Sequence, residues 1–271
     1  MAISESRLKF IADAFSLEAA MEVQRSLLPK TIPLIPGFDI AANCIYCDET
    51  GGDDYDFIDE TRTGKGVLRV VVGDVSGHGI SSALLMTTAR GYLRQRAAMS
   101  GGMDRIISDV NDQLTQDVAE SGQFVTLLFS EIDVVNRTMR WVRAGHEPAF
   151  VYDESGGDFQ ELSGKGLPLG IFRETDFEIR QQELRPGQIV IFTTDGIRET
   201  FDQKGRMFGD SRLKALIHEH ARQSAQAIAM AVIDAAVAFR RPLKQEDDIT
   251  LVVIKVKERS GEQIDATVNR Q

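Results

Sequence analysis

The sequence lacks a second cysteine pair, an excess of basic residues and a hydrophobic run long enough to cross a membrane. Its two cysteines, Cys44 and Cys47, have the C-x-x-C spacing found in some zinc and redox sites. A zinc site of this kind needs four ligands, and neither a second cysteine pair nor a nearby histidine completes one here. We therefore expect both cysteines to be ordinary residues of one strand, pointing to opposite faces.

Charge and hydropathy argue against two classes of partner. The formal net charge is −10, whereas nucleic acids and anionic membrane surfaces attract basic proteins. The longest weakly polar stretch, residues 227–239, is too short to span a bilayer and contains Asp234. Polar residues interrupt the first ten positions, which argues against a secretory signal. We expect a soluble, cytoplasmic protein that binds neither nucleic acid nor membrane.

The chain is long enough for one large domain with a substantial core, since 42% of its 271 residues are apolar. Apolar residues at three- and four-residue steps predict a helix over residues 5–28, which Pro29 ends. We expect residues 1–36 to form a regulatory or linker helix with its connector. Residues 37–257 would form the main domain, and residues 258–271 a polar tail.

Runs of apolar residues predict the remaining elements. Predicted strands cover residues 38–47, 67–73, 124–134, 139–144, 148–152, 188–193 and 249–256. Predicted helices cover residues 80–99, 103–119, 211–221 and 224–239. A turn at Asn136-Arg137-Thr138 joins two strands as a hairpin, which makes that pair antiparallel. Because strands cluster with strands and helices with helices, we expect an α+β fold rather than a doubly wound parallel sheet.

Four short motifs place aspartate beside glycine or another small residue at the end of an apolar strand. They are Gly51-Gly52-Asp53, Gly73-Asp74-Val75-Ser76-Gly77-His78-Gly79, Thr194-Asp195-Gly196 and Asp247-Asp248-Ile249-Thr250. We expect these carboxylates to converge at one rim of a sheet without being buried. Clustered carboxylates repel one another, divalent cations relieve that repulsion, and all-oxygen ligands favour Mg²⁺ or Mn²⁺ over Zn²⁺. Each motif alone is a weak signal, so the prediction depends on their joint occurrence.

With these motifs the chain resembles the metal-dependent (PPM, 2C-like) serine/threonine protein phosphatases, and in particular their SpoIIE/RsbU branch. The resemblance covers residues 20–257, nearly the whole chain. Seven segments match in the order typical of the family: Val23-Gln24-Arg25-Ser26-Leu27-Leu28-Pro29, Gly51-Gly52-Asp53, residues 73–79, Ala144-Gly145-His146, Gly166-Leu167-Pro168-Leu169-Gly170, Thr193-Thr194-Asp195-Gly196 and Asp247-Asp248-Ile249-Thr250.

The resemblance implies an α-β-β-α sandwich, in which two antiparallel sheets lie face to face with helices outside. It also implies two Mn²⁺ or Mg²⁺ ions, with Asp74 bridging both and the carbonyl oxygen of Val75 adding a backbone ligand. Asp53 would serve one ion, and Asp195 and Asp247 the other. Water activated by the ions would then hydrolyse phosphoserine or phosphothreonine without a covalent phospho-enzyme.

Gly52, His78 and Asp248 are secondary candidates at this site, and Asp248 is a less favoured ligand than its neighbour. Eukaryotic-type relatives place a histidine two residues after the bridging aspartate as a candidate general acid. Here that position is Ser76, so the acid stays unassigned. We favour a structural role for His78, although it could also be the acid, and a scaffold role for His146.

The resemblance also implies partners. In RsbU-like proteins the segment corresponding to residues 5–28 links a sensory domain to the phosphatase and often helps to form a dimer. It therefore implies a homodimer and an upstream sensor or regulator acting through this helix, unless the apolar stripe packs on its own domain. The family's usual substrates are phosphorylated STAS-type anti-anti-sigma proteins in bacterial partner-switching and stress-response pathways.

Two other functions remain open. The first is a catalytically silent interaction module of the same fold, which the full set of four aspartates argues against. The second is a nucleotide cyclase, because Gly51-Gly52-Asp53-Asp54-Tyr55 is similar to the G-G-D/E-E-F signature of diguanylate cyclases. The last two positions differ from that signature, and a cyclase leaves Asp74, Asp195 and Asp247 unexplained.

Overall fold

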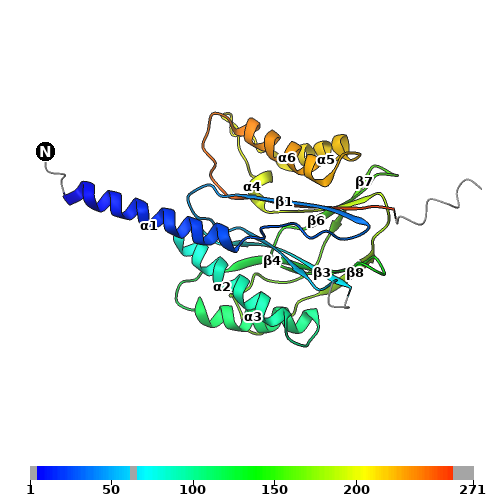
Figure 1. Ribbon diagram of the computed structural model, residues 1–271, viewed down its shortest axis with the longest axis horizontal. Coiled ribbons are helices and arrows are strands. Elements are labelled where there is room, and N and C mark those ends of the chain that lie inside the picture. The colour runs from blue at the N-terminus through cyan, green and yellow to red at the C-terminus, as the bar shows by residue number, and fades with distance from the viewer. Residues whose placement is uncertain (1–4, 62–65, 259–271) are drawn as a thin grey trace, which may run out of the picture.

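The structure, a computed structural model, describes residues 5–61 and 66–258 of the chain. Within them, two five-stranded antiparallel sheets pack face to face, with helices on both outer faces (Figure 1). The predicted α-β-β-α sandwich is therefore confirmed. In the described part of the chain, no helix combines the length and the hydrophobicity needed to cross a membrane.

The first sheet, sheet A, has the strand order β1-β10-β9-β6-β7, and every neighbouring pair is antiparallel. Its strands are β1 (Phe38–Ile45), β6 (Ala149–Asp153), β7 (Asp158–Leu162), β9 (Gln188–Thr193) and β10 (Ile249–Val256). The first and last strands of the domain pair along their whole length, from Phe38 opposite Val256 to Ile45 opposite Ile249. This pairing brings segments about 200 residues apart together beside the site.

The second sheet, sheet B, has the order β2-β3-β4-β5-β8 and is also antiparallel throughout. Its strands are β2 (Asp54–Asp59), β3 (Val67–Val75), β4 (Val125–Asp133), β5 (Thr138–Ala144) and β8 (Ile179–Glu183). The predicted hairpin between β4 and β5 is confirmed, with Arg137 in the left-handed region at its turn.

Helices cover the outer face of each sheet (Figure 1). The helices of the described residues are α1 (Glu5–Leu27), α2 (Ile80–Ala97), α3 (Met103–Asp117), α4 (Asp195–Arg198), α5 (Gly209–His220) and α6 (Ala225–Arg240). The side chains of α2 and α3 pack on sheet B, and those of α5 and α6 pack on sheet A. Helix α1 projects away from the sandwich, and its C-terminal end meets the domain (Figure 1).

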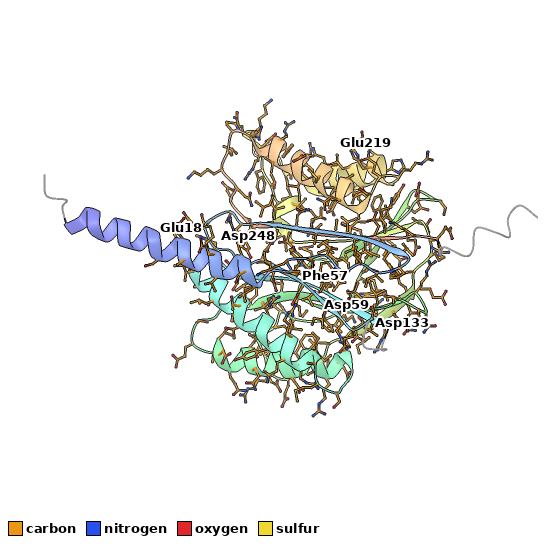
Figure 2. All side chains as sticks on the ribbon, viewed as in Figure 1. Glu18, Phe57, Asp59, Asp133, Glu219 and Asp248 are labelled. Carbon is orange, nitrogen blue, oxygen red and sulfur yellow. The ribbon has the colours of Figure 1, made fainter. Side chains whose placement is uncertain are left out.

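The nearly continuous apolar run of β3 reflects burial on both faces of sheet B. Val70 and Val72 lie in the core between the sheets, whereas Val71 lies in the core beneath α2 and α3. Successive side chains of a strand point to opposite faces, so a strand covered on both sides is apolar at most positions; the buried Arg69 of β3 is paired with Glu60 and Glu131. Phe57 of β2 also fills the space between the sheets (Figure 2).

Several elements differ from the sequence-based expectations. Strands β2, β7 and β8 and the short helix α4 were not predicted. Strands β7 and β8 form sheet edges and are largely exposed, so their sequences carry little apolar signal. Cys47 does not lie in a strand, because β1 ends at Ile45; both cysteines are free. Of the predicted tail, residues 259–271 lie outside the described residues.

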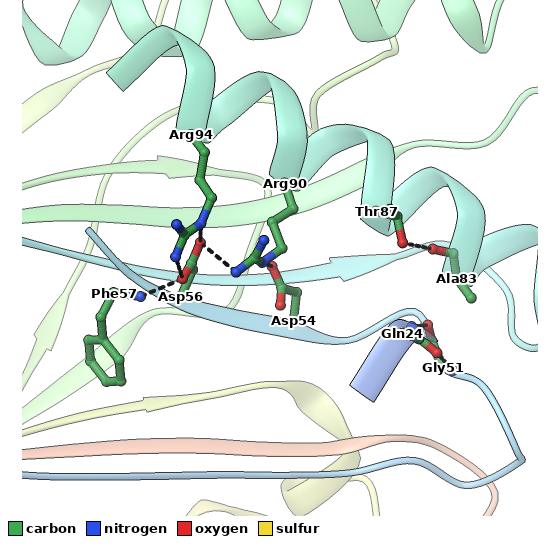
Figure 3. Close-up of polar contacts among 9 residues, drawn as sticks. All are labelled: Gln24, Gly51, Asp54, Asp56, Phe57, Ala83, Thr87, Arg90 and Arg94. Carbon is green, nitrogen blue, oxygen red and sulfur yellow. Dashed lines mark hydrogen bonds and ion pairs between the residues drawn. The ribbon is translucent and has the colours of Figure 1, made fainter. Parts of the chain in front are cut away.

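Two residues of the predicted apolar stripe of α1 are not covered by the domain, whereas Leu27 at the end of the helix is half-buried. Ala19 is exposed, and 62% of Val23 is exposed. Gln24, by contrast, is buried. Its side-chain nitrogen donates to the carbonyl oxygen of Gly51 at 2.7 Å, and its side-chain oxygen accepts from the Gly51 amide at 3.2 Å (Figure 3). Helix α1 is therefore attached to the segment that precedes Asp53 through a polar contact.

We predict that Leu128→Ala lowers the free energy of unfolding by about 2–5 kcal/mol. Leu128 is fully buried between the two sheets, so its truncation leaves a cavity that the packed strands cannot close. Met230→Ala is the control, since Met230 is half exposed on α6, and we expect a change below about 0.5 kcal/mol. Chemical denaturation measures both values, and similar losses would contradict the layered core described here.

Candidate metal centre

Four aspartates from both sheets meet at one end of the sandwich. Asp53 directly precedes β2, and Asp74 lies near the end of the neighbouring strand β3. Asp195 begins α4 immediately after β9, and Asp247 lies just before β10. The Thr194 hydroxyl donates to the Asp53 carboxylate at 2.7 Å and so joins the two sheets at this end.

This arrangement differs from the expected one in two respects. The carboxylates come from two facing sheets rather than from one rim, and Asp53 is almost completely buried. Asp247, by contrast, is exposed. The difference arises because the ends of two packed sheets converge, so a residue at the junction is covered by the opposite sheet. The predicted aspartates thus lie together between the ends of the two sheets as a candidate site, in which Asp53 is buried and Asp247 is exposed.

Asp248 holds the backbone of the loop that carries Asp53. One of its carboxylate oxygens accepts from the Cys47 amide at 2.8 Å. The other accepts from the amides of Gly52 at 2.8 Å and Asp53 at 3.2 Å. A carboxylate with three backbone donors is already satisfied, so its role is to fix the loop. Figure 2 shows Asp248 at the end of the sandwich that α1 approaches.

The two glycines before Asp53 allow close packing at this point. A Cβ atom on Gly51 would lie 2.1 Å from a carboxylate oxygen of Asp248. A Cβ atom on Gly52 would lie 2.7 Å from the carbonyl oxygen of Val75. Gly52 therefore lets the Asp53 loop approach the loop after Asp74, next to the carbonyl predicted as a backbone ligand.

The carboxylates destabilise one another in the ionised state. Burial, followed by the charges of Asp195, Asp247 and Asp248, raises the pKa of Asp74 to about 8. Burial and then the charge of Asp74 raise the pKa of Asp53. These shifts follow from negative charges held close together in a poorly hydrated place. The site therefore contains too little positive charge to balance its carboxylates.

The pKa values of Asp247 and Asp195, the more exposed aspartates of the site, are raised as well. Partial desolvation and the charge of Asp195 raise the pKa of Asp247 to about 6. Desolvation and then Glu147 raise the pKa of Asp195, and Arg198 opposes that shift. Arg198 contacts Glu147 and lies 3.4 Å from Asp210. Arg198 and Glu147 were not singled out from the sequence, because no spacing rule connects them to the aspartate motifs.

The donor set fits a hard divalent cation. As the side chains stand, the described residues contain no group of three or more histidine, cysteine, aspartate or glutamate side chains placed to hold a metal ion. The chemistry of the cluster nevertheless matches such an ion, because its carboxylates raise one another's pKa and a cation would remove that repulsion. The residues that would hold it are Asp53, Asp74, Asp195, Asp247 and the carbonyl of Val75.

The two histidines considered from the sequence lie in contrasting environments. His78 is exposed on the loop after Asp74, with its Nδ1 atom 3.2 Å from a carboxylate oxygen of Asp48. His146 is buried, and burial lowers its pKa to about 4. Its Nδ1 atom lies 2.8 Å from the Thr126 hydroxyl, which also bonds to the Asp74 carbonyl at 3.3 Å. A neutral, buried His146 supports the backbone of β3.

A partly buried group of ion pairs fixes β2 to α2 beside the site (Figure 3): the Asp56 carboxylate is buried, whereas 45% of the Arg94 side chain is exposed. Arg94 donates two hydrogen bonds to Asp56, at 2.5 and 2.7 Å. Arg90 lies 3.3 Å from Asp56 and 3.7 Å from Asp54. Burial and the charge of Asp56 raise the pKa of Asp54, while the two arginines oppose that rise. The strand that follows Asp53 is thus held on the side of sheet B that faces α2.

The fold and the site together define the class of protein. Two facing antiparallel sheets of this kind occur in the SiaA-PP2C domain of Pseudomonas aeruginosa. That structure superposes with a TM-score of 0.78 and 24% identity over 92% of this chain and 98% of its own. The chain therefore has the fold of the PP2C phosphatase domains.

Sequence comparison identifies the family within that class. The profile of the family described as Stage II sporulation protein E (SpoIIE) matches residues 64–257. The chain belongs to the SpoIIE family, and the predicted membership of the SpoIIE/RsbU branch is confirmed.

One further protein is similar to this chain in sequence, and another is similar in structure. The phosphoserine phosphatase RsbU of Bacillus subtilis (strain 168) is 27% identical over 89% of this chain and 70% of its own length. The RsbU and RsbW domains of Rv1364c from Mycobacterium tuberculosis superpose with a TM-score of 0.69 and 25% identity. That match covers 84% of this chain and 62% of the Rv1364c chain.

We predict that Gly52→Ala lowers the free energy of unfolding by about 1–3 kcal/mol, because the new methyl group would press on the Val75 carbonyl. Gly91→Ala is the matched control. Gly91 lies on the exposed side of α2 with open space around it, and alanine there should stabilise the protein by about 0.5–1 kcal/mol. Thermal unfolding distinguishes the two, and equal effects would show that the loops are not in close contact.

Proposed function

We propose that this chain hydrolyses phosphoserine or phosphothreonine on a protein substrate, using two Mn²⁺ or Mg²⁺ ions. Asp53, Asp74, Asp195, Asp247 and the Val75 carbonyl would hold the ions. The observation that carries the proposal is the meeting of four mutually repelling aspartates from both sheets at one end of the fold. Similarity to RsbU, a phosphoserine phosphatase, supports the same activity.

The chain's own residues divide into those that would bind the ions and those that hold the binding loops. When bound, the ions would lower the pKa of a water molecule and offset the charge of the phosphoryl group. The charges of Asp195 and Asp247 both raise the pKa of Asp74, which therefore lies close to both aspartates from sheet A. Asp74 is thus the residue best placed to be shared between two ions. Asp248, Thr194 and Gln24 hold the Asp53 loop at its position.

The proton donor for the leaving serine oxygen is unassigned. The low pKa of His146 keeps that residue neutral at physiological pH, and its Nδ1 atom is engaged with Thr126. His78 is exposed near the site and pairs with Asp48, which leaves both a positioning role and proton donation available to it. Measuring the rate of hydrolysis by His78→Ala with and without added small acids separates these roles. A large loss of rate that the acids restore indicates proton donation, and a small loss indicates positioning.

We further propose that the substrate is a phosphorylated STAS-type anti-anti-sigma protein in a partner-switching pathway. The resemblance to the RsbU branch supports this, as does the likeness to a structure that contains RsbU and RsbW domains. A panel of phosphorylated STAS proteins, assayed with Mn²⁺ and with Mg²⁺, identifies the substrate and the preferred ion. Turnover of GTP instead of phosphoester would favour the cyclase alternative.

We also propose that residues 1–36 form a regulatory and dimerisation segment and that residues 37–257 form the phosphatase domain. Two observations support a regulatory role for α1. Its apolar residue Val23 is exposed, and Gln24 is bonded to the loop that carries Asp53. A second copy of the helix or an upstream regulator would cover Val23 and could act on the site through Gln24.

We predict that Asp74→Asn and Asp195→Asn each reduce Mn²⁺-dependent hydrolysis of a phosphoserine peptide by at least ~100-fold, since even residues behind the ligands contribute 10–100-fold in metal sites. Circular dichroism should show an intact fold in both variants. Asp234→Asn, at an exposed position on α6, controls for the loss of one negative charge. Wild-type protein that is inactive on phosphoesters with either ion would favour the silent interaction module.

We predict that Asp74→Asn stabilises the metal-free protein and that the gain grows between pH 5 and pH 8. The pKa of Asp74 rises from 3.8 to about 8 on folding, so the folded state binds the proton more tightly. The stability that this proton contributes is fully present below pH 3.8 and is lost as the pH rises through about 8.

Denaturant unfolding of wild type and Asp74→Asn at both pH values measures this difference. Added Mn²⁺ should then stabilise the wild type more than the variant at pH 8. A difference that does not change with pH, or equal stabilisation by Mn²⁺, would show that Asp74 is not part of a repelling, cation-binding cluster.

A further inference from the structure

The segment that crosses from sheet B to sheet A is attached to the strand that carries Asp74. Residues 145–148 join β5, in sheet B, to β6, in sheet A, and contain His146 and Glu147. The Thr126 hydroxyl lies 2.8 Å from the Nδ1 atom of His146 and also bonds to the carbonyl oxygen of Asp74. Thr126 is the partner of Asp74 in the pairing of β3 with β4. The crossing segment and Asp74 are therefore held together.

Arg143 of β5 also fixes the backbone of this crossing segment. Its Nη1 atom donates to the carbonyl oxygen of His146 at 2.7 Å. Its Nε atom donates to the carbonyl oxygen of Gly164 at 2.9 Å. Because Glu147 directly follows His146, its backbone has a defined place relative to Asp74.

Arg198 extends from the helix that begins with Asp195. Helix α4 contains residues 195–198, so Arg198 lies about one turn after Asp195. The helix packs closely on the segment before β10, since a Cβ atom on Gly196 would lie 1.9 Å from the carbonyl oxygen of Asp248. A helix packed this closely moves as a unit, so the place of Arg198 is coupled to that of Asp195.

An ion pair joins α4 to the crossing segment. Arg198 contacts the carboxylate of Glu147, and its Nη1 atom lies 3.4 Å from a carboxylate oxygen of Asp210 at the beginning of α5. The Arg198 side chain is only 15% exposed, and that of Glu147 is 39% exposed. The charge of Glu147 raises the pKa of Asp195 and that of Arg198 lowers it, which shows that both lie near Asp195. The pair thus connects the surroundings of Asp195 to sheet B.

We propose that Arg198 and Glu147 are positioning residues, which together set the separation between Asp195 and Asp74 and so the spacing of two bound ions. The inference rests on the proposed function, because it concerns the ions that these aspartates would hold. The sheets pack through apolar side chains, and hydrophobic contacts have no preferred direction. A directional polar link at the end of the sandwich fixes carboxylates that belong to different sheets. Paired catalytic ions lie typically ~3.5–4 Å apart, so their ligands tolerate little displacement.

A second link on the other side of Asp195 supports this interpretation. The Thr194 hydroxyl donates to Asp53, which precedes the first strand of sheet B, and accepts from the Thr250 amide at 3.0 Å. The residue before Asp195 therefore bonds to one end of sheet B. Arg198, one turn after Asp195, is joined to the segment that leaves sheet B. Asp195 is thus held to the facing sheet from both directions along the chain.

Positioning and simple electrostatics predict different signs for one variant. If charge alone mattered, removal of the positive charge of Arg198 would strengthen Mn²⁺ binding at the nearby aspartates. Removal of the negative charge of Glu147 would weaken it. If the two residues position Asp195, loss of either one weakens Mn²⁺ binding. The effect of Arg198→Met therefore distinguishes the two explanations.

The test is a double-mutant cycle on the full chain, with Arg198→Met, Glu147→Ala and the double variant. Titration calorimetry measures Mn²⁺ affinity without substrate, so this readout is independent of turnover. We expect each single variant to weaken Mn²⁺ binding about ten-fold, as is typical for residues that orient metal ligands. The double variant should lose no more than the weaker single variant, because both substitutions break the same link.

Two controls accompany the cycle. Glu147→Gln removes the same charge as Glu147→Ala but keeps an oxygen acceptor, so its loss should be below about three-fold. Arg222→Met with Glu154→Ala breaks an exposed pair, 3.4 Å apart, beyond the opposite end of β6, and should change the affinity less than about two-fold. Thermal unfolding without metal tests the fold of every variant. If Arg198→Met does not fold, the two Glu147 variants decide the question, since they differ in hydrogen bonding and not in charge.

Turnover of p-nitrophenyl phosphate at saturating Mn²⁺ is the second readout. We expect Arg198→Met and Glu147→Ala to lower kcat at least about five-fold with little change in KM, because the ions are displaced while the substrate meets the same surface. A loss confined to KM would assign Arg198 to phosphate binding and would overturn the proposal. Tighter Mn²⁺ binding by Arg198→Met, additive losses in the double variant, or equal losses in Glu147→Ala and Glu147→Gln would also overturn it.

This inference and the proposed function fail in different ways. A wild type that binds Mn²⁺ with the expected dependence on Arg198 and Glu147 but hydrolyses no phosphoester would retain the inference and remove the phosphatase function. An active wild type whose Mn²⁺ affinity does not depend on either residue would do the reverse. A wild type that binds neither Mn²⁺ nor Mg²⁺ would remove both.

Discussion

The architecture of this protein depends on holding mutually repelling carboxylates at the junction of two sheets. Ionised carboxylates destabilise the folded state when they are brought together with little water. The pKa of Asp74 is raised because burial and the neighbouring carboxylates disfavour its ionised form. The buried core between the sheets stabilises the arrangement against this repulsion. Local hydrogen bonds then fix the geometry, since Asp248 accepts three backbone amides and Thr194 bonds to Asp53.

Three different parts of the chain hold the segments on either side of Asp53. Gln24 of α1 bonds to Gly51, and Asp248 beside β10 bonds to the amides of Gly52 and Asp53. Arg90 and Arg94 of α2 hold the strand that follows. Removing either arginine would leave the buried carboxylate of Asp56 with less compensating charge. The position of Asp53 therefore depends on how α1, α2 and sheet A pack together.

Sequence patterns predicted the buried strands well, because β3, β9 and β10 are apolar on both faces and their extents follow from burial. Edge strands such as β8 escaped prediction, since exposed residues give no periodic signal. The four-layer arrangement came from the family resemblance. The role of Asp248 was not predictable from spacing, because its amide donors lie 195 to 201 residues away and only the pairing of β1 with β10 brings them together.

The full-length pairing of β1 with β10 has a consequence for biosynthesis. During translation β1 leaves the ribosome before every other strand of the two sheets, whereas its partner strand and Asp248 emerge only when almost the entire domain has been made. Until then, the Asp53 loop lacks the carboxylate that shapes it, and β1 has no partner strand, because β10 is its neighbour in sheet A. A nascent chain therefore cannot assemble the candidate site until the last strand has been added.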